Sequence, residues 1–122
     1  MILVDTSVWI NYLRAADERL AALLDAREVL AHPSVTGEVA LGNLPRRDVV
    51  LRELHDLPQA AVATDEEVLN LIERQALFGR GIGYIDAHLV AAVRLTADAK
   101  LWTRDRRLQS VAAELGLAAN LF

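Results

Sequence analysis

Four acidic side chains could form a metal site, because each comes from a different predicted helix or strand end that the fold could bring together. They are Asp5, Glu38, Asp86 and Asp105. Carboxylates held within a few ångströms of one another repel and take up protons unless a cation lies between them. Hard divalent cations such as Mg²⁺ prefer oxygen ligands of this kind. One or two such ions would activate a water molecule against a phosphodiester, so these residues predict metal-dependent hydrolysis without a nucleophilic side chain.

Short apolar runs alternate with amphipathic segments along the chain, as strands and helices do in α/β proteins. The predicted strands cover residues 2–5, 28–31, 60–63, 101–103 and, at the edge, 118–121. The predicted helices cover residues 7–13, 19–26, 34–41, 48–55, 64–77, 84–95 and 106–115. The alternation requires crossover connections, which imply a parallel sheet with helices on both faces.

This topology places the acids near one edge of the sheet. Asp5 and Asp105 lie at or just after strand carboxyl ends, where sites form in open α/β sheets. Glu38 and Asp86 lie on predicted helices, each on an otherwise apolar stripe where a carboxylate is costly unless paired or metal-bound. Taken individually, each of the four acids could instead have a purely structural role. Asp5 or Asp105 could cap a helix, Glu38 could be a surface residue, and the dipole of its helix could favour Asp86.

Composition limits the class of protein. The 122 residues are 53% hydrophobic and 25% charged, which predicts one well-packed domain over residues 1–122. The absence of cysteine excludes thiolate metal sites, and no signal-peptide pattern is present, so we expect a cytoplasmic protein. Its longest nearly apolar stretch, residues 89–95, is too short to cross a bilayer. The three histidines lack ligand spacing and are interpreted as ordinary buried or surface imidazoles.

Arginines supply the local positive charge that a net charge of −4 does not. Binding of a nucleic acid depends on the local field rather than on the total, and the arginine fork suits phosphate. Three basic groups lie beside or downstream of the acidic segments, although each could be ordinary solvated surface. The predicted RNA-contacting residues are Arg46, Arg47, Arg80, Arg104, Arg106 and Arg107.

Four segments carry a resemblance to a known family through their order and spacing. They read VDTSVWI at residues 4–10, HPSVTGEVALG at 32–42, GIGYIDAHL at 81–89 and LWTRD at 101–105. Together they resemble the PIN-domain ribonuclease toxins called VapC, over the whole chain. The resemblance implies a three-layer α/β/α PIN-like fold with a central parallel sheet. It also implies an Mg²⁺- or Mn²⁺-dependent endoribonuclease, the toxin of a type II toxin–antitoxin system that inhibits translation and growth.

The same resemblance implies partners and residue roles. The partners are a small VapB-type antitoxin, a second copy in a homodimer, and structured RNA such as transfer or ribosomal RNA. By motif position, the four acids match the acidic residues of the family. Thr103 falls where the family often has a site hydroxyl, and Thr6 and Ser7 lie next to the first acid. Asn11 stands where the nearest relatives are expected to have aspartate, which puts any accessory role of that position in doubt.

Two other classes share features of this pattern. A haloacid-dehalogenase-like phosphatase or a phospho-receiver domain also gathers aspartates around Mg²⁺, but one aspartate is then the nucleophile. Asp5 is not followed two positions later by the second aspartate of such phosphatases, and the only lysine, Lys100, precedes its strand. The third class is a non-catalytic PIN-like binding module, which the presence of all four acids disfavours.

Overall fold

The computed structural model describes residues 1–121 and contains a parallel sheet in the order β2–β1–β3. The central strand β1 covers Ile2–Val4, β2 covers Val29–Leu30 and β3 covers Lys100–Trp102. Leu3 of β1 pairs with Leu30 on one side and Leu101 on the other. Because the strands are parallel, their carboxyl ends meet at one edge of the sheet, where Asp5 and Thr103 directly follow β1 and β3.

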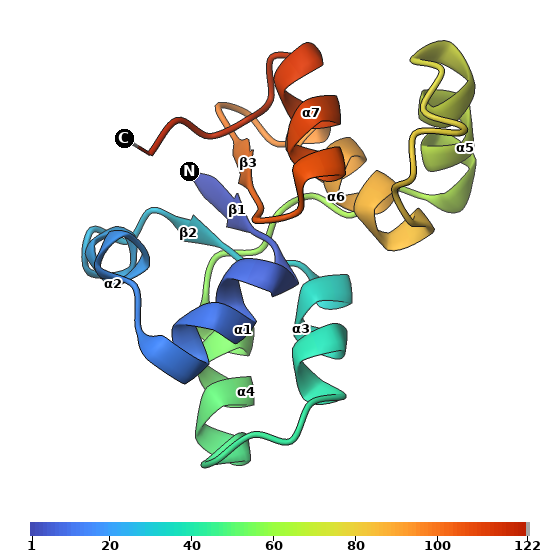
Figure 1. Cartoon of the computed structure of the whole chain (residues 1–122). Helices are drawn as coiled ribbons and strands as arrows, with labels where there is room; N and C mark the ends of the chain where they lie inside the picture. Colours follow the sequence, from blue (N-terminus) through green and yellow to red (C-terminus); the bar gives the residue numbers. More distant parts are fainter. Residues whose placement is uncertain (122) are drawn as a thin grey trace.

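Seven helices within residues 1–121 surround this sheet (Figure 1). They are α1 Thr6–Ala15, α2 Glu18–Asp25, α3 Pro33–Ala40, α4 Arg47–Asp56, α5 Asp65–Arg74, α6 Tyr84–Leu95 and α7 Arg106–Glu114. Each lies where the sequence predicts a helix, although the ends differ by a few residues. Within the described part of the chain, no helix has both the length and the apolarity that a membrane span requires.

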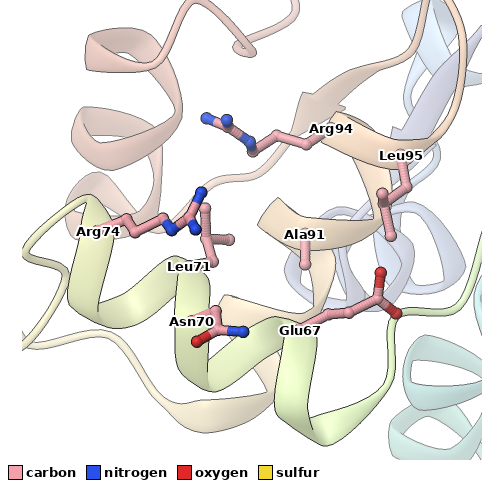
Figure 2. Close-up of a pocket in the computed structure, with 7 residues that line it drawn as sticks. All are labelled: Glu67, Asn70, Leu71, Arg74, Ala91, Arg94 and Leu95. Atoms are coloured by element: carbon pink, nitrogen blue, oxygen red, sulfur yellow. The ribbon is translucent and has the colours of Figure 1, made fainter.

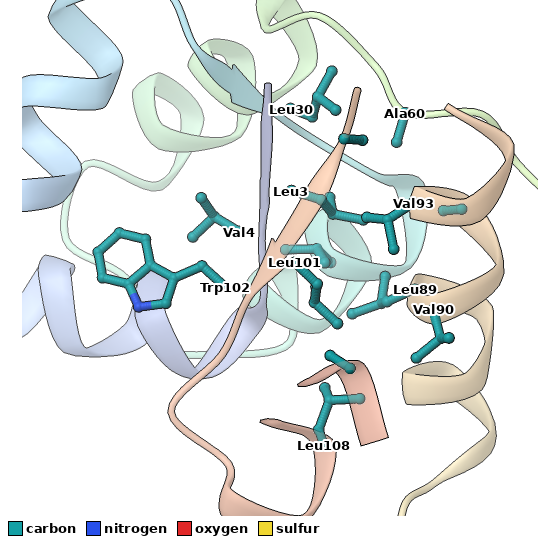
Figure 3. Close-up of a cluster of buried hydrophobic side chains, with 14 of the residues drawn as sticks. Leu3, Val4, Leu30, Ala60, Leu89, Val90, Val93, Leu101, Trp102 and Leu108 are labelled. Atoms are coloured by element: carbon teal, nitrogen blue, oxygen red, sulfur yellow. The ribbon is translucent and has the colours of Figure 1, made fainter. Parts of the chain in front are cut away.

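The sheet has a layer of helices on each face, as the three-layer prediction requires. Successive strand residues point to opposite faces. Figure 3 shows Leu3 and Leu101 directed toward α6, and Val4 and Trp102 directed to the other side. Helix α6 is buried along most of its length, since Leu89, Val90 and Ala92 have no measurable exposure. The buried sheet and α6 form a rigid base for the strand ends.

Two of the predicted strands, at residues 60–63 and 118–121, do not form. Residues 60–63 contain no bridge, and only the preceding residue, Gln59, makes an isolated bridge to Ala31. The amide of Ala60 donates to Ala31 O at 2.8 Å, but the amide of Ala61 donates to Thr96 Oγ1 at 2.9 Å. The next bond of this ladder would need an amide at residue 33, but Pro33 has no N–H and begins α3, so the ladder ends here. At residues 118–121 there is likewise a single bridge, from Ala118 to Leu101.

Helix α5 is shorter than predicted, ending at Arg74 instead of Leu77. Its beginning is as expected, with Thr64 and Glu67 forming a reciprocal capping box. Its end is set by Ala76, whose φ of 50° lies in the left-handed region. The amide of Leu77 then turns back to Ile72 O at 2.9 Å, which closes the helix end.

Candidate active site

Asp5 is the most buried of the four acids, with 5% exposure. It precedes α1, but its carboxylate makes no capping hydrogen bond to that helix. Instead Oδ2 accepts hydrogen bonds from Ser7 Oγ and from Thr103 Oγ1, both at 2.7 Å. The capping alternative for Asp5 is therefore wrong. The carboxylate is held by two hydroxyls, one from α1 and one from the end of β3.

The two hydroxyls are themselves fixed by backbone amides. The amide of Asp105 donates to Thr103 Oγ1 at 3.0 Å, and the amide of Arg104 donates to Ser7 Oγ at 3.0 Å. Each hydroxyl therefore accepts from the chain after β3 and directs its own hydrogen to Asp5. This network fixes the rotamer of Asp5 and joins the carboxyl ends of β1 and β3.

Glu38 reaches the same edge from α3. Its Oε1 accepts a 2.8 Å hydrogen bond from Thr6 Oγ1, the residue next to Asp5. The prediction that Glu38 lies on a buried stripe is wrong, because Glu38 is exposed and Leu41 is 89% exposed, whereas Val35 is buried. The surface-residue alternative is correct about its exposure. The contact with Thr6 nevertheless places this carboxylate beside the first acid.

Asp86 stands in the first turn of α6 and is half-buried. Its Oδ2 accepts from the amide of Gly83 at 3.0 Å. Burial raises the pKa of Asp86 above its ordinary value, and the negative charges of Asp5, Asp105 and Glu38 raise it further, against the opposing effect of the Gly83 amide. The other three acids are thus close enough to Asp86 to repel its charge. The four predicted residues converge on one place.

Asp105 caps α7, as one of the two sequence interpretations proposed. Its Oδ1 accepts from the amides of Arg107 and Leu108, at 2.8 Å and 3.1 Å. The cap fixes the carboxylate just beyond β3, three residues after Trp102. Capping occupies only one of its two oxygens, so it leaves the second available for a ligand.

All four carboxylates share this division between their two oxygens. One oxygen of each is held by a protein donor, and no donor among residues 1–121 bonds to the other. The free oxygens form an all-oxygen donor set of the kind that hard divalent cations take, and a cation would relieve the repulsion at Asp86. Within residues 1–121, no three acidic or histidine side chains already stand as a complete ligand set. The residues fit a divalent ion in charge and donor type, and binding would draw the free oxygens together.

Comparisons with known proteins agree on one family. The PIN domain model matches residues 2–114. Ribonuclease VapC32 of Mycobacterium tuberculosis, in strains CDC 1551 / Oshkosh and ATCC 25618 / H37Rv, is 54% identical over 118 residues, which cover 97% of this chain and 95% of that protein. This chain belongs to the VapC family of PIN-domain proteins. The match to the PIN model spans the segments that contain all four acids.

Solved structures support the fold of this VapC-family chain. FitAcB from Neisseria gonorrhoeae superposes with a TM-score of 0.62 at 23% identity, covering 93% of this chain and 94% of that one. FitAB bound to an IR36 DNA fragment gives a TM-score of 0.59 at 23% identity, covering 93% and 91%. The layered fold predicted from the sequence is confirmed by these neighbours.

The six arginines predicted to contact RNA fall into four situations in this VapC-family fold. Arg80 forms a two-pronged ion pair with Glu114, at 2.8 and 2.9 Å. Arg107 lies against the loop before α6, where a Cβ on Gly81 would come within 2.8 Å of its side chain. Arg104 and Arg106 are exposed beside Asp105.

Arg46 and Arg47 lie apart from the acids. The loop that precedes them packs against Leu13 near the far end of α1. The axial distance along α1 from Asp5 to Leu13 is about 12 Å at the rise of an α-helix. Arg47 also donates to Gly42 O at 3.0 Å. Of the predicted group, only the arginines around Asp105 lie directly beside the acidic cluster.

One polar cluster was missed in the sequence. Asp65 accepts from Tyr84 Oη at 2.7 Å and contacts His88 Nε2 at 3.1 Å. Hydrogen bonds from Tyr84 and then His88 lower the pKa of Asp65. The signal available was the four-residue spacing of Tyr84 and His88 on one helix face, which lets both reach the same partner. The cluster ties α5 to α6 immediately beside Asp86.

A pocket between α5 and α6 is separate from the acidic cluster (Figure 2). Leu71 and Ala91 contribute to its floor, and Arg74 and Arg94 extend over the same space. Arg94 follows Asp86 by eight residues on α6, which is about 12 Å along the axis. None of the residues predicted for the active site lines this pocket.

Proposed function

We propose that this VapC-family protein is a metal-dependent endoribonuclease in which four carboxylates hold one or two Mg²⁺ or Mn²⁺ ions. The carboxylates are those of Asp5, Glu38, Asp86 and Asp105. The observation that carries the proposal is their shared geometry, with one oxygen fixed by the protein and the other free, together with the charge repulsion felt by Asp86. The name Ribonuclease VapC32 for a relative 54% identical supports RNA as the substrate.

Each of the four acids has a proposed role that follows from its position. Asp5, Asp86 and Asp105 are proposed as direct ligands, and Glu38, which is exposed, as a ligand or as the base that positions water. When bound, a divalent ion supplies the positive charge that activates water and offsets the charge on the scissile phosphate. Ser7 and Thr103 hold Asp5 in place, and Thr6 holds Glu38. Because water attacks rather than the ribose hydroxyl, the products should carry a 5′-phosphate and a 3′-hydroxyl.

Membership in the VapC family supports a cellular role for this enzyme. As a VapC protein it is the toxin of a type II toxin–antitoxin system, and a VapB-type antitoxin is its proposed inhibitor. We place its action in the cytoplasm, on structured RNA such as transfer or ribosomal RNA. Exposed apolar side chains, with Leu41 at 89%, Phe78 at 63% and Leu69 at 57%, support a homodimer.

The test is cleavage of purified transfer and ribosomal RNA by the protein with Mg²⁺, with Mn²⁺ and with EDTA. Cleavage should require the metal and should be lost in Asp5→Asn, Asp86→Asn and Asp105→Asn, because each removes a charged ligand while keeping its shape. Glu53→Gln, on the exposed surface of α4, is the control and should cleave normally. Metal-independent cleavage would remove the ions from the mechanism.

The same assay separates the other two classes. A phosphatase would release phosphate from a small phosphomonoester and leave RNA chains intact, and its aspartyl intermediate would be trapped by acid quenching. A non-catalytic module would bind RNA without cutting it under any metal condition.

A further inference from the structure

A second pocket adjoins the acidic cluster through Thr103, which lines the pocket and donates to Asp5. It has a volume of about 370 Å³, within the range of roughly 300–1,000 Å³ typical of small-ligand pockets. Its walls come from α2, from the end of β3, from α7 and from the segment that follows α7. Thr103 and Arg104 line it, and both belong to the network that fixes Asp5. A molecule lying across the acids would therefore reach this pocket directly.

One wall of the pocket is an arginine held over an indole. The guanidinium carbon of Arg19 lies 5.1 Å from the centroid of a Trp102 ring. Asp17 fixes that guanidinium through two hydrogen bonds, at 3.2 Å to Nε and 2.9 Å to Nη2. The Arg19 side chain is nevertheless 48% exposed, so the indole covers only part of it. The result is a flat cationic surface of fixed orientation that faces solvent.

Two further side chains of the pocket, those of Gln109 and Arg104, have no hydrogen-bond or ion-pair partner within residues 1–121. Gln109 on α7 lines the pocket, and its side-chain amide makes no hydrogen bond within residues 1–121. Arg104 also lines the pocket, and its exposed side chain has no ion-pair partner in that same range. An amide offers both a donor and an acceptor, and a guanidinium binds phosphate with its fork of donors. These groups suit a planar ligand with polar edges and an attached phosphate.

We propose that this pocket binds one unpaired base of the RNA substrate next to the scissile phosphate. Proteins read single-stranded RNA by stacking bases on aromatic rings or on guanidinium planes and by hydrogen bonds to the base edges. Arg19 supplies the stacking plane, Gln109 reads the base edge, and Arg104 contacts the phosphate between base and metal site. The inference rests on the proposed ribonuclease function and adds to it the residues that choose the cleavage position.

Cleavage mapping tests this role. Wild type, Arg19→Ala, Arg104→Ala and Gln109→Ala would each digest the same pool of unstructured RNA of mixed sequence, with the new 5′ ends sequenced. The pocket variants should lose the base preference of the wild type at one position beside the cut. Gln109→Ala should lower affinity about 2- to 10-fold and Arg19→Ala about fivefold or more. Arg19→Lys should behave like Arg19→Ala, because lysine keeps the charge and lacks the plane.

Two exposed positions provide matched controls. Ser110→Ala changes the residue after Gln109, and Arg52→Ala removes one exposed positive charge from α4, which does not line the pocket. Both should keep the wild-type cleavage pattern. Pocket variants that cut the same positions as the wild type, with the same efficiency, would overturn the inference while the ribonuclease function stands.

A binding experiment tests the pocket apart from catalysis. The chain has two tryptophans, so Trp9→Phe leaves Trp102 as the only indole. In EDTA, oligo(A), oligo(C) and oligo(U) would be titrated into this protein while Trp102 emission is recorded. A change that depends on the base and is lost in Gln109→Ala supports the pocket even if the protein cuts no RNA. Emission that ignores all three RNAs, or that responds only to an antitoxin peptide, refutes it.

Discussion

The hydroxyl of Thr103 donates a 2.7 Å hydrogen bond to Oδ2 of Asp5 and joins residues that are 98 positions apart in the chain. Thr103 is itself 7% exposed and accepts from the amide of Asp105. A single buried hydroxyl thus links the first acid to the backbone of the last one. In a metal site, such partners of the ligands set the orientation and basicity of the carboxylate.

Removing this hydroxyl should weaken metal binding. Thr103→Val keeps the shape but leaves Asp5 with one donor fewer and the Asp105 amide without an acceptor. Loss of outer partners typically costs about 10- to 100-fold in metal affinity or activity, so we expect a loss in that range. Mn²⁺ binding, followed by electron paramagnetic resonance, measures it without cleavage. Thr103→Ser is the matched control and should retain most of the affinity, and equal affinities for Val and Ser would show that the hydroxyl does not orient Asp5.

Asp86→Asn should stabilise the metal-free protein near neutral pH. Because the folded-state pKa of Asp86 is raised, its contribution to stability is fully present below the ordinary value of 3.8 and is lost as the pH rises through the folded value. Near pH 7 the charged carboxylate therefore costs stability, which asparagine removes while still accepting from Gly83. A gain in Tm of roughly 2–5 °C in EDTA is expected, and the gain should vanish as the pH falls to the ordinary pKa.

Bound metal should reverse the order of Tm between the wild type and Asp86→Asn. Saturating Mg²⁺ or Mn²⁺ stabilises the wild type by binding the folded state and should raise Asp86→Asn much less. Glu53→Gln, an exposed change on α4, should shift Tm little in either condition. If Asp86→Asn melts below the wild type in EDTA near neutral pH, the repulsion among the four acids is not the dominant effect at this residue.

The four acids were predictable, but their individual environments were not. Asp5 and Asp105 follow strands that apolar runs reveal, so topology alone brings them to one edge. Whether an aspartate caps a helix depends on which donor lies nearest in three dimensions. Two side-chain hydroxyls hold Asp5, whereas the first amides of α7 hold Asp105. Each aspartate directly precedes the first residue of its helix, so its position relative to the helix does not distinguish the two cases.

The strand predicted at residues 60–63 is absent for a similar reason. These residues have the composition of a strand, but the next ladder bond would need an amide at residue 33, which is proline and begins α3. The partner of Arg80 was equally hidden, because Glu114 is 34 positions away and no periodicity connects a loop residue to a helix end. Contacts between distant parts of the chain decide such details, and local pattern does not report them.

Arg80 and Glu114 should position Asp86 rather than bind RNA. Their ion pair fastens the loop before α6 to α7, and Arg107 packs on Gly81 in the same loop. Arg80→Ala and Glu114→Ala should each reduce Mn²⁺ affinity by up to about tenfold, at the low end for outer-shell changes. The exchange Arg80→Glu with Glu114→Arg should restore it. If Arg80 instead binds RNA, Glu114→Ala will have no effect and the exchange will not rescue RNA affinity.

The protein should be a homodimer at high micromolar concentration. Small domains rarely expose many large apolar side chains unless a partner covers them, and Leu41, Phe78 and Leu69 are all more than half exposed. Sedimentation equilibrium should give twice the chain mass, and Leu41→Glu or Phe78→Glu should shift the equilibrium toward monomer if either lies in the interface. Thermal melts check that these variants fold. A strictly monomeric wild type at this concentration would rule out the dimer.

A VapB-type antitoxin should compete with metal for the acidic cluster. The free oxygens of the four carboxylates attract any cation, and an arginine or lysine on an antitoxin segment can replace the charge of the ion. Competition is reciprocal, so raising Mn²⁺ should weaken antitoxin binding to the wild type. Isothermal titration of the co-purified antitoxin into the toxin, over a series of Mn²⁺ concentrations, measures this dependence.

The double variant Asp86→Asn, Asp105→Asn separates this mechanism from remote inhibition. Two fewer charges should lower affinity for the cationic segment, and antitoxin binding should then show little dependence on Mn²⁺. Arg52→Ala, which leaves the cluster intact, should keep the metal dependence of the wild type. Antitoxin affinity that ignores both Mn²⁺ and the double substitution would place inhibition elsewhere, through blocked access of RNA or a distorted dimer.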